Sequence, residues 1–557
     1  MLRIPFYSLT IFLLGLSSCR QPKGNIPSST DIDALTLKKG KIISCGADQQ
    51  FGLANLEMSC DKRSLADFRL AVSLLHSFEY DEAEKAFAKV IDETPGCSMA
   101  YWGVAMSNFH ALWAPPAIAE LKKGSKAIEI ANSITNKTSR EQAYIKAIDA
   151  YYAGWETVSH KERCKRYADA MEKLHAAYPS DKEAAAFYAL SLVAAADPSD
   201  KTYTNQLKAG TILSALYPGQ PDHPGIVHYI IHTYDYPEIA QHALTAARKY
   251  AGIAPSSAHA LHMPSHIFTR LGLWDECIRS NQESVSSAQC YAEETKIGKH
   301  WDEELHGLDY LVYAYLQKGD NDAANRQLQY LNTIKEVKPT NFKVAYSFAA
   351  IPARILLENK DWKAAAQLLN TQTPVNWKEY PWQESITHFS RLLGAAHTRD
   401  LASATKELQI LKALRDTLLR QNDSYKAQQV DVQILTGEAW IEFQSGKKDT
   451  ALKRMIQAAD LEDKTEKHPV TPGEILPARE LLGDLLMEMN RYTEALSAYE
   501  RSLKKNPARF NSLYGAALAA SKTGNPERAA SFARDLINQS PGSKRAEVLL
   551  ARDLSRN

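Results

Sequence analysis

The chain has 557 residues, far more than one compact hydrophobic core requires, so it forms either several domains or an elongated repeat array. Its 66 Lys and Arg residues balance 65 Asp and Glu residues, and a formal charge of +1 offers no basic field to gather nucleic acid, so we expect no nucleic-acid partner. Abundant Ala, Leu, Glu, Lys and Tyr, with 25 Gly and 24 Pro, are typical of a helical protein and not of a disordered one.

The first 19 residues have the pattern of an export signal. Arg3 precedes an apolar run that is shorter than the roughly 20 residues of a spanning helix, and small residues come before Cys19. Residues 16–19 resemble the lipobox of bacterial lipoproteins, which implies that Cys19 is lipidated and holds the chain in the bacterial cell envelope, on the periplasmic or outer-membrane face. An ordinary signal peptide with a chance cysteine and a short membrane anchor are the alternatives.

Residues 20–45 are predicted to form a flexible tether, because this stretch is polar and contains Pro, Gly and Ser. An exported chain permits disulfides, and Cys45 and Cys60 flank a Gly-containing loop, so we expect a disulfide between these two cysteines. The sequence contains no CxxC motif, so neither a zinc ribbon nor a thioredoxin-type site is supported.

A repeat of 34 residues is clearest near the C-terminus. Small residues and a proline recur at this spacing, first as Gly483, Ala495 and Pro507 and then as Ala517, Ala529 and Pro541. Small residues permit close helix contact and the proline ends the second helix, so each unit is a helix hairpin that needs neighbours to cover its apolar face. We therefore predict an all-α tetratricopeptide-repeat solenoid, with one array over residues 46–340 and a second over residues 341–557.

Two repeat units contain a proline within the expected first helix, namely Pro264 and Pro352. Proline inside a helix removes one backbone hydrogen bond and clashes with the preceding turn, at a cost of about 3 kcal/mol. Each of these helices therefore either kinks at its proline or begins late, with the proline in its first turn.

The chain from about residue 61 to residue 557 resembles tetratricopeptide-repeat proteins. The motifs HPGIVHYIIHTYD, starting at His223, and HALHMPSHIFTRLGLWD, starting at His259, are similar to those of a bacterial group of such proteins. This resemblance implies the fold more than it implies any chemistry.

Histidines are concentrated between Pro221 and Asp309, and two pairs have i,i+4 spacing. His228 and His232 form one pair and His262 and His266 form the other, so each pair lies on one helical face and can share a metal ion. The zincin protease motif is absent because no Glu follows the first histidine of either pair. The predicted metal ligands are His228, His232, His262, His266, His306 and Asp309, for a transition metal such as Zn, Fe or Cu.

The resemblance also implies a concave groove lined by the first helices of the repeats. Candidate groove residues are His76, His110, Trp113, His223, Asp235, His259, Arg270, Trp382, Glu384 and His388. A polar groove whose histidines bond to backbone, to Tyr hydroxyls and to each other is the alternative to a metal site.

Three functions are compatible with these patterns. The first is an exported, lipid-anchored protein that binds a peptide, a glycan or a partner protein in its concave groove. The second is a metal-dependent enzyme, hydrolytic or oxidative, that uses the histidine cluster. The third is a nutrient-capturing outer-membrane lipoprotein, for which the lipobox and the helical repeats are the only support.

Overall fold

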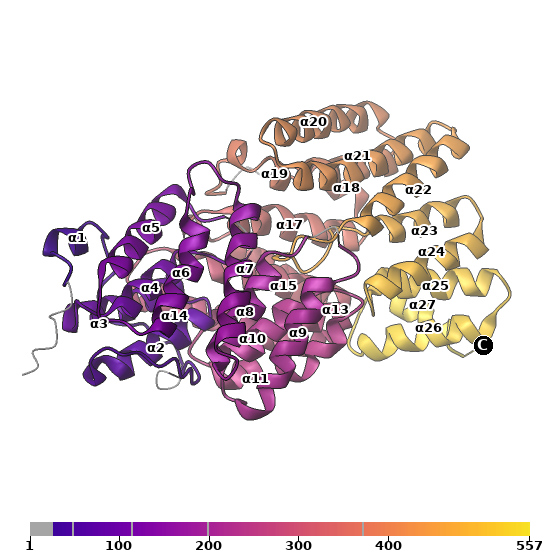
Figure 1. Ribbon diagram of the computed structural model, residues 1–557. Helices are drawn as coiled ribbons and strands as arrows, with labels where there is room; N and C mark the ends of the chain where they lie inside the picture. Colours follow the sequence, from indigo (N-terminus) through magenta and orange to yellow (C-terminus); the bar gives the residue numbers. More distant parts are fainter. Residues whose placement is uncertain (1–25, 47–49, 113–114, 198–199, 370–372, 557) are drawn as a thin grey trace, which may run out of the picture.

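The structure is a computed structural model that describes residues 26–46, 50–112, 115–197, 200–369 and 373–556, and this part of the chain is almost entirely helical (Figure 1). The predicted signal peptide and Cys19 lie outside the described residues. None of the described helices has the length and hydropathy needed to cross a membrane.

The helices follow one another as antiparallel hairpins. The first group is α1 (Ser29–Asp33), α2 (Leu65–His76), α3 (Tyr80–Glu93), α4 (Ser98–Ser107), α5 (Ile118–Ser133), α6 (Ser139–Tyr152), α7 (His160–Ala177), α8 (Lys182–Ala194) and α9 (Thr204–Leu216). The middle group is α10 (Pro224–Tyr234), α11 (Leu244–Ile253), α12 (Ala258–His262), α13 (Pro264–Leu271), α14 (Trp274–Glu294), α15 (Asp302–Gln317), α16 (Asn321–Leu331), α17 (Phe342–Glu358) and α18 (Trp362–Ala365).

The last group completes the array. It is α19 (Pro381–His397), α20 (Leu401–Arg420), α21 (Ser424–Gln444), α22 (Lys448–Lys464), α23 (Ala478–Glu488), α24 (Tyr492–Lys505), α25 (Phe510–Lys522), α26 (Pro526–Gln539) and α27 (Ala546–Leu554). Short 3-10 turns are η1 (Lys62–Ser64), η2 (Tyr217–Gly219), η3 (Ala240–Ala243) and η4 (Trp377–Glu379), and one parallel pair of strands joins β1 (His300–Trp301) to β2 (Val337–Lys338). The prediction of an all-α helical-repeat solenoid is confirmed.

The small residues of the repeat have the packing role expected of them. A Cβ atom added to Gly483 in α23 would lie 2.6 Å from the ring of Tyr499 in α24, so only glycine permits this approach of the two helices. The buried residues form four hydrophobic clusters, and one of them joins Leu308 of α15 to Phe348 of α17. The predicted boundary at residue 340 falls within that cluster, so packing does not separate the two arrays.

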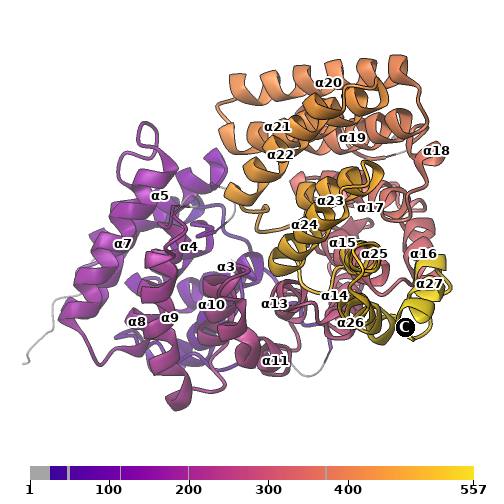
Figure 2. The same ribbon diagram turned by 90° about the vertical axis from the view of Figure 1, so that its right-hand side faces the viewer.

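The array closes on itself, because its last helices contact helices that lie far earlier in the sequence. In Figure 2, α23–α27 lie beside α14–α17, although α18–α22 separate the two groups in sequence. Trp274 Nε1 donates to the carbonyl of Ala508 at 3.0 Å, and the backbone N–H of Phe510 donates to Gln317 Oε1 at 2.9 Å. The buried Arg509 side chain forms ion pairs with Glu358 and Glu480, each at 2.7 Å. The C-terminal repeats therefore cover helices of the middle group.

The segment predicted as a flexible tether is packed against the body over much of its length. Leu35 is fully buried, and the backbone N–H of Ile43 donates to Glu82 Oε2 at 2.9 Å. The expectation of a detached tether is therefore wrong for the stretch from α1 to Cys45, because its apolar side chains find a place in the core. Residues 20–25 lie outside the described part of the chain.

The predicted Cys45–Cys60 disulfide is also wrong. Cys45 is bonded to Cys290 at the end of α14, and Cys60 is bonded to Cys97 beside the start of α4. Both partners are brought close by the packing of the N-terminal segment across the helices, which the spacing of cysteines in the sequence does not reveal. The remaining described cysteines, Cys164 and Cys277, are free and buried.

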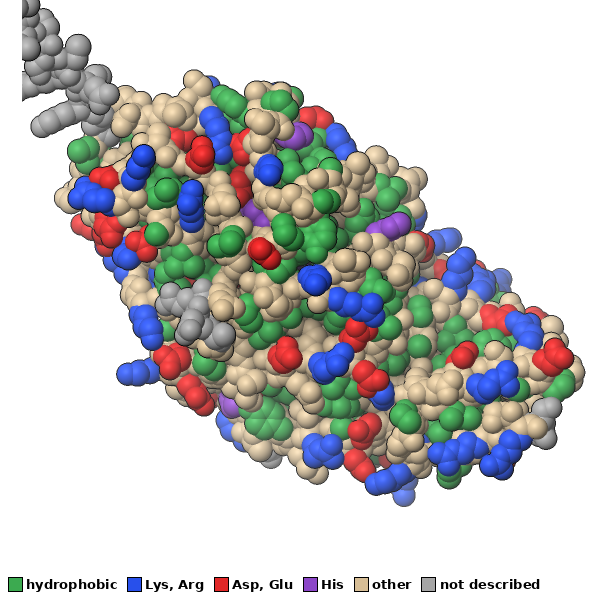
Figure 3. All heavy atoms as spheres, turned by 90° about the horizontal axis from the view of Figure 1, so that it is seen from below, with side chains coloured by type: hydrophobic (Ala, Val, Ile, Leu, Met, Phe, Trp, Pro, Cys, Tyr) green, Lys and Arg blue, Asp and Glu red, His purple; other side chains and the backbone are tan. Residues whose placement is uncertain are grey.

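The surface carries charges of both signs. On the face shown in Figure 3, Lys and Arg side chains are interspersed with Asp and Glu side chains, and no large area of one sign stands out. That no nucleic acid binds stays a prediction.

Candidate metal centre

Helix α10 places the first histidine pair. His223 caps the helix by accepting from the backbone N–H of Ile226 at 3.3 Å, and Pro224 follows in the first turn, where its missing N–H costs nothing. His228 Nε2 lies 3.0 Å from His232 Nε2 and 3.2 Å from His259 Nε2. We call the group His228, His232 and His259 site A.

A break at Pro264 places the second pair. The helix is divided there into α12 and α13, so Pro264 begins a new helix. Pro352, in contrast, lies inside the continuous helix α17. Side chains of α14 satisfy carbonyls of α12, since Ser280 Oγ donates to Leu261 O at 2.5 Å and Ser284 Oγ donates to Ala258 O at 2.9 Å. This support holds the broken helix in place.

The break leaves the second histidine pair facing each other. His262 Nε2 and His266 Nε2 are 3.1 Å apart, and the ring of His306 in α15 lies 4.2 Å from that of His262. We call the group His262, His266 and His306 site B. Within each site, one nitrogen from every histidine lies within 4.8 Å of the others, which suits ligands of one ion.

Hydrogen bonds at the far side of the rings decide which nitrogen carries the proton. His228 Nδ1 donates to the carbonyl of His76 at 2.7 Å, and His266 Nδ1 donates to Asp235 Oδ2 at 3.0 Å. His262 Nδ1 donates to Asn281 Oδ1 at 2.7 Å, an orientation fixed by the bond from Asn281 Nδ2 to Cys277 O. Each of these neutral rings therefore presents an unprotonated Nε2 to its site.

Site B consequently brings two lone pairs together. His262 Nε2 and His266 Nε2 face each other with no proton between them, a repulsive contact unless a cation is shared. The Tyr310 hydroxyl is 3.4 Å from His266 Nε2, too far for a good hydrogen bond. Among the described residues, His262 Nε2 has no other hydrogen-bond partner. A shared metal ion would replace this repulsion by two ligand bonds.

Burial keeps the six histidines in the neutral form that metal ions bind. All six are buried, from full burial of His228 to 8% exposure of His232 and His259. Burial lowers the pKa of His228 to about 3 and also lowers the pKa of His266. Burial likewise holds the pKa well below its usual range for His232, His259, His262 and His306.

A third cluster, formed by His76, Glu183 and His223, has the spacing of a metal site but a different chemistry. Glu183 accepts from His76 Nε2 at 2.9 Å and from His223 Nε2 at 3.0 Å. Tyr229 donates its hydroxyl hydrogen to His76 Nδ1 at 2.8 Å, and His223 Nδ1 accepts from the backbone. Hydrogen bonds thus satisfy every ring nitrogen, and the predicted groove residues His76 and His223 support site A through the His76 carbonyl.

Asp309, predicted as a metal ligand, lies outside the three-histidine groups. Its carboxylate is buried against the Arg354 guanidinium of α17, which removes it from site B. Burial raises the pKa of Asp309 to about 6, against the opposing effect of Arg354. His259, predicted only for the groove, belongs to site A with His228 and His232.

Asp235 and Arg270, predicted for the groove, lie directly behind site B. Asp235 accepts from His266 Nδ1 and, at 2.8 Å, from Arg270 Nε. Burial acts to raise the pKa of Asp235, but the charges of Lys467 and Arg270 outweigh it and lower that pKa. Asp235 therefore stays ionised and orients His266. Sequence reasoning missed Asn281, because a single asparagine within a helix follows no motif.

A cavity of about 390 Å³ reaches site A. It is lined from the α4–α5 connection, helices α7, α8, α10, α13 and α21, and the 465–477 connection between α22 and α23. Its polar lining includes His160, His232, Asp235, Arg270, Tyr425 and Lys467, and its apolar lining includes Leu112, Val193, Ala194 and Ala196. A cavity of this size and mixed character suits a small organic molecule.

Lys467 is the least well-paired charge in the cavity wall. Its ammonium lies 3.9 Å from Asp235 Oδ2 and 3.4 Å from the carbonyl of His468, and its side chain is 4% exposed. Burial lowers the pKa of Lys467 to about 8. The 465–477 connection is held by Tyr425, which donates its hydroxyl hydrogen to Glu466 O at 2.9 Å.

The other groove candidates belong to neither site. His110 pairs with Glu120 at 3.2 Å and stacks on Tyr80, while His388 on α19 pairs with Glu407 and lies 3.9 Å from Glu384. Trp113 lies outside the described residues.

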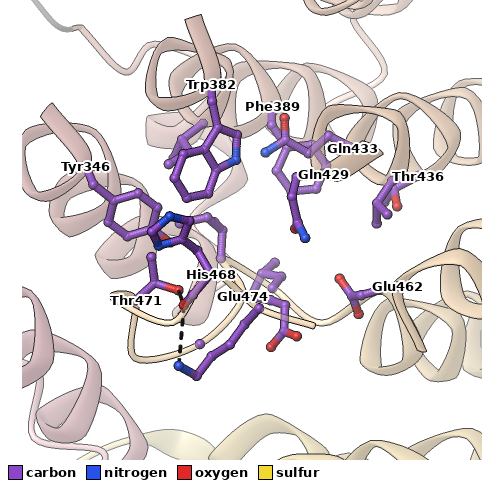
Figure 4. A pocket seen from close by; sticks show the side chains of 16 residues that line it. Tyr346, Trp382, Phe389, Gln429, Gln433, Thr436, Glu462, His468, Thr471 and Glu474 are labelled. Atoms are coloured by element: carbon purple, nitrogen blue, oxygen red, sulfur yellow. Dashed lines mark hydrogen bonds between the residues drawn. The ribbon is translucent and has the colours of Figure 1, made fainter. Parts of the chain in front are cut away.

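Trp382 lines a separate, much smaller hollow. It packs beside Tyr346 and His468, with ring centroids 5.3 and 5.2 Å away, and Glu462 and Glu474 lie across from it (Figure 4). The hollow has a volume of about 40 Å³, which is room for a few water molecules at most. Trp382 is therefore a packing residue here and not a free ligand contact.

Comparison with known proteins identifies the repeat type. Residues 481–544 match the family described as tetratricopeptide repeat, so this C-terminal stretch of the array consists of tetratricopeptide repeats. Similar solved structures include a human IFIT1 dimer with PPP-AAAA, at 12% identity and TM-score 0.34, and one with m7Gppp-AAAA, at 11% and 0.32. Each alignment covers 91% of this chain and 99% of the other. A comparison with curated proteins found no match.

Proposed function

We propose that the chain is a metalloprotein in which sites A and B each bind one transition-metal ion. One observation carries this function: His262 Nε2 and His266 Nε2 lie 3.1 Å apart although both Nδ1 atoms donate elsewhere. Two imidazole nitrogens bound to one ion at about 2 Å each are separated by about this distance. Six buried neutral imidazoles in two groups of three supply the ligands.

We further propose that the metal centre acts on a small molecule held in the 390 Å³ cavity. Three protein ligands leave an open coordination position for water or substrate. The cavity wall includes His232 of site A, so a bound molecule is next to the metal ligands. A metal-dependent enzyme, hydrolytic or oxidative, is the function that this arrangement supports best.

Metal analysis of protein purified without a His tag tests the metal function. We expect about two equivalents of a transition metal after reconstitution, and about one in His228→Ala and in His262→Ala. His388→Ala is the matched control, because His388 is a partly buried histidine outside both sites, and it should keep both ions. If reconstituted wild-type chain, shown to be folded by circular dichroism, retains no metal, the metal function is wrong.

A second function is binding of a partner protein, peptide or glycan by the repeat array. The tetratricopeptide match over residues 481–544 supports it. We propose that this binding uses the outer surface of these repeats. Capture experiments with wild-type chain and with charge reversals on the exposed face of α26 test this: equal capture by both would argue against that surface. The nutrient-capturing function has no further support.

We also propose that the chain works outside the cytoplasm, tethered through Cys19. The disulfides Cys45–Cys290 and Cys60–Cys97 support this location, because such bonds persist in oxidising compartments. Membrane fractionation with Cys19→Ala is the test, and release of that variant into the soluble fraction is expected. Equal membrane retention of wild type and variant would contradict lipidation at Cys19.

A further inference from the structure

We infer that the two metal ions are copper and that the pair binds dioxygen. This rests on the proposed metal function and specifies the metal, the small molecule that it takes and the class of reaction. Three properties of sites A and B lead to it: the type of ligand, the charge around the ions and the closeness of the two sites.

The type of ligand favours copper over iron. Non-haem iron centres that use dioxygen have two histidines and one carboxylate, whereas the ligand groups found among the described residues at sites A and B contain three histidines each. Asp235 is bonded to the outer nitrogen of His266, and Asp309 is paired with Arg354. Neither free cysteine is among the ligand groups. All-imidazole sites suit copper, and Cu(II) binds nitrogen ligands more strongly than the other divalent ions of its row.

The charge around the sites favours monovalent ions. The six histidines are neutral, and Asp235, which accepts from the His266 ring, is already balanced by Arg270 and Lys467. Lys343, whose charge acts on His259, His262 and His306, is itself paired with Asp302 and Glu303, so it leaves no excess negative charge to receive a divalent ion. Two divalent ions would add four charges to this buried region, whereas two Cu(I) ions add two, and desolvation cost rises steeply with charge. Two sites of three imidazoles each, with no anionic ligand, therefore suit two Cu(I) ions better than two Zn(II) ions.

The two sites adjoin each other. His259 of site A and His262 of site B are three residues apart on α12, and the rings of His232 and His266 are 6.4 Å apart between centroids. A diatomic molecule can therefore contact both ions at once.

Dioxygen binding keeps the charge of the centre constant. Each Cu(I) gives one electron and becomes Cu(II), and dioxygen accepts the two electrons and is reduced to the level of peroxide with its O–O bond retained. The total charge is +2 before the step, from two Cu(I), and +2 after it, from two Cu(II) and the dianion. No proton and no further reductant is needed for this step, so a buried site can carry it out without a charge penalty.

The experiment is anaerobic reconstitution of the full chain with Cu(I), followed by exposure to dioxygen. We expect about two copper ions per chain, uptake of about one dioxygen per copper pair and a new charge-transfer absorption band. Because two Cu(II) ions that share a bridging ligand are magnetically coupled, the oxygenated protein should give little or no electron paramagnetic resonance signal. His232→Ala and His266→Ala should each hold about one copper, which gives the signal of an isolated Cu(II) after oxidation, while His388→Ala should behave as wild type.

The outcomes separate this inference from the metal function on which it rests. A spin count in oxidised wild type equal to its full copper content would show two independent ions and overturn the dioxygen pair. Preferential retention of zinc from an equimolar mixture of the two metals would overturn copper while leaving a metalloprotein. Absence of any bound metal would overturn both. If a ligand variant fails to fold, the spin count of the wild-type protein alone still shows whether the two copper ions are coupled.

Discussion

His266 Nδ1 donates to Asp235 Oδ2 at 3.0 Å while Arg270 Nε donates to the other oxygen of the same carboxylate at 2.8 Å, so one aspartate fixes the orientation of a metal-site histidine. Outer partners of this kind change metal affinity by about 10- to 100-fold. We therefore expect Asp235→Asn to weaken metal binding at site B by that factor, as measured by competition with a chromophoric chelator.

Asp309→Asn is the matched control for this prediction. It removes a buried carboxylate that was also a candidate ligand, but one that contacts Arg354 and not a histidine of site B. Metal affinity should be unchanged, whereas the free energy of unfolding should fall by about 3–5 kcal/mol because Arg354 loses its partner. Loss of affinity in Asp309→Asn with none in Asp235→Asn would reverse the assignment of the two aspartates.

Metal removal should destabilise the protein. Without an ion, site B keeps two facing lone pairs at 3.1 Å, and with one it gains two ligand bonds. An ion present at about 1,000 times its dissociation constant contributes about 4 kcal/mol per site. Differential scanning calorimetry of the metal-free and reconstituted chain should show a higher Tm for the reconstituted form. Identical Tm values would speak against binding in the folded state.

The metal-free chain should lose stability as the pH falls from about 6.5. Burial lowers the pKa of His228 to about 3, so between pH 6.5 and 3 the unfolded state binds a proton that the folded state does not. Stability is therefore full above the unfolded pKa, decreases as the pH falls, and His228 contributes no further loss below about pH 3. Urea unfolding at several pH values should show this slope, and His228→Asn should reduce it. A flat profile for the metal-free wild type would contradict the burial of these neutral rings.

Disulfide mapping checks how the N-terminal segment is attached. Peptide mass spectrometry without reduction should find Cys45 joined to Cys290 and Cys60 joined to Cys97. Replacing Cys45 and Cys290 together by Ser should lower the free energy of unfolding by about 2–5 kcal/mol. A peptide joining Cys45 to Cys60 would falsify this attachment.

The ion pairs that close the array can be compared with an exposed pair. Arg509→Met leaves Glu358 and Glu480 buried without their partner, so a loss of about 3–5 kcal/mol is expected in denaturant unfolding. Lys544→Ala breaks only the exposed pair with Asp322 and should change stability by less than about 1 kcal/mol. Equal effects of the two changes would show that the closing contact is weak.

Periodicity in the sequence predicts the helical array and most of the histidine cluster. The 34-residue spacing of Gly483 and Ala517 marks helix hairpins, and i,i+4 spacing brings His228 to His232 because both lie on α10. The same spacing predicts His262 beside His266, although the structure places them on two short helices, α12 and α13, that meet at Pro264. Contacts between distant helices follow from the curvature of the array, which no local pattern encodes. The sequence pattern therefore predicts His259 only as a groove residue. It predicts Asp309 as a ligand, although Asp309 is paired with Arg354, 45 residues later.

The closure of the array distinguishes it from an open stack of repeats. An open stack of repeats frays from its ends, and each unit depends only on its neighbours. Here Phe510 bonds to Gln317 at the end of α15, the same helix that carries His306. The last repeats lie far beyond the histidines in the sequence, but they support the helix that carries His306 of site B. A chain truncated before Arg509 would therefore lose this support for site B as well as its last helices.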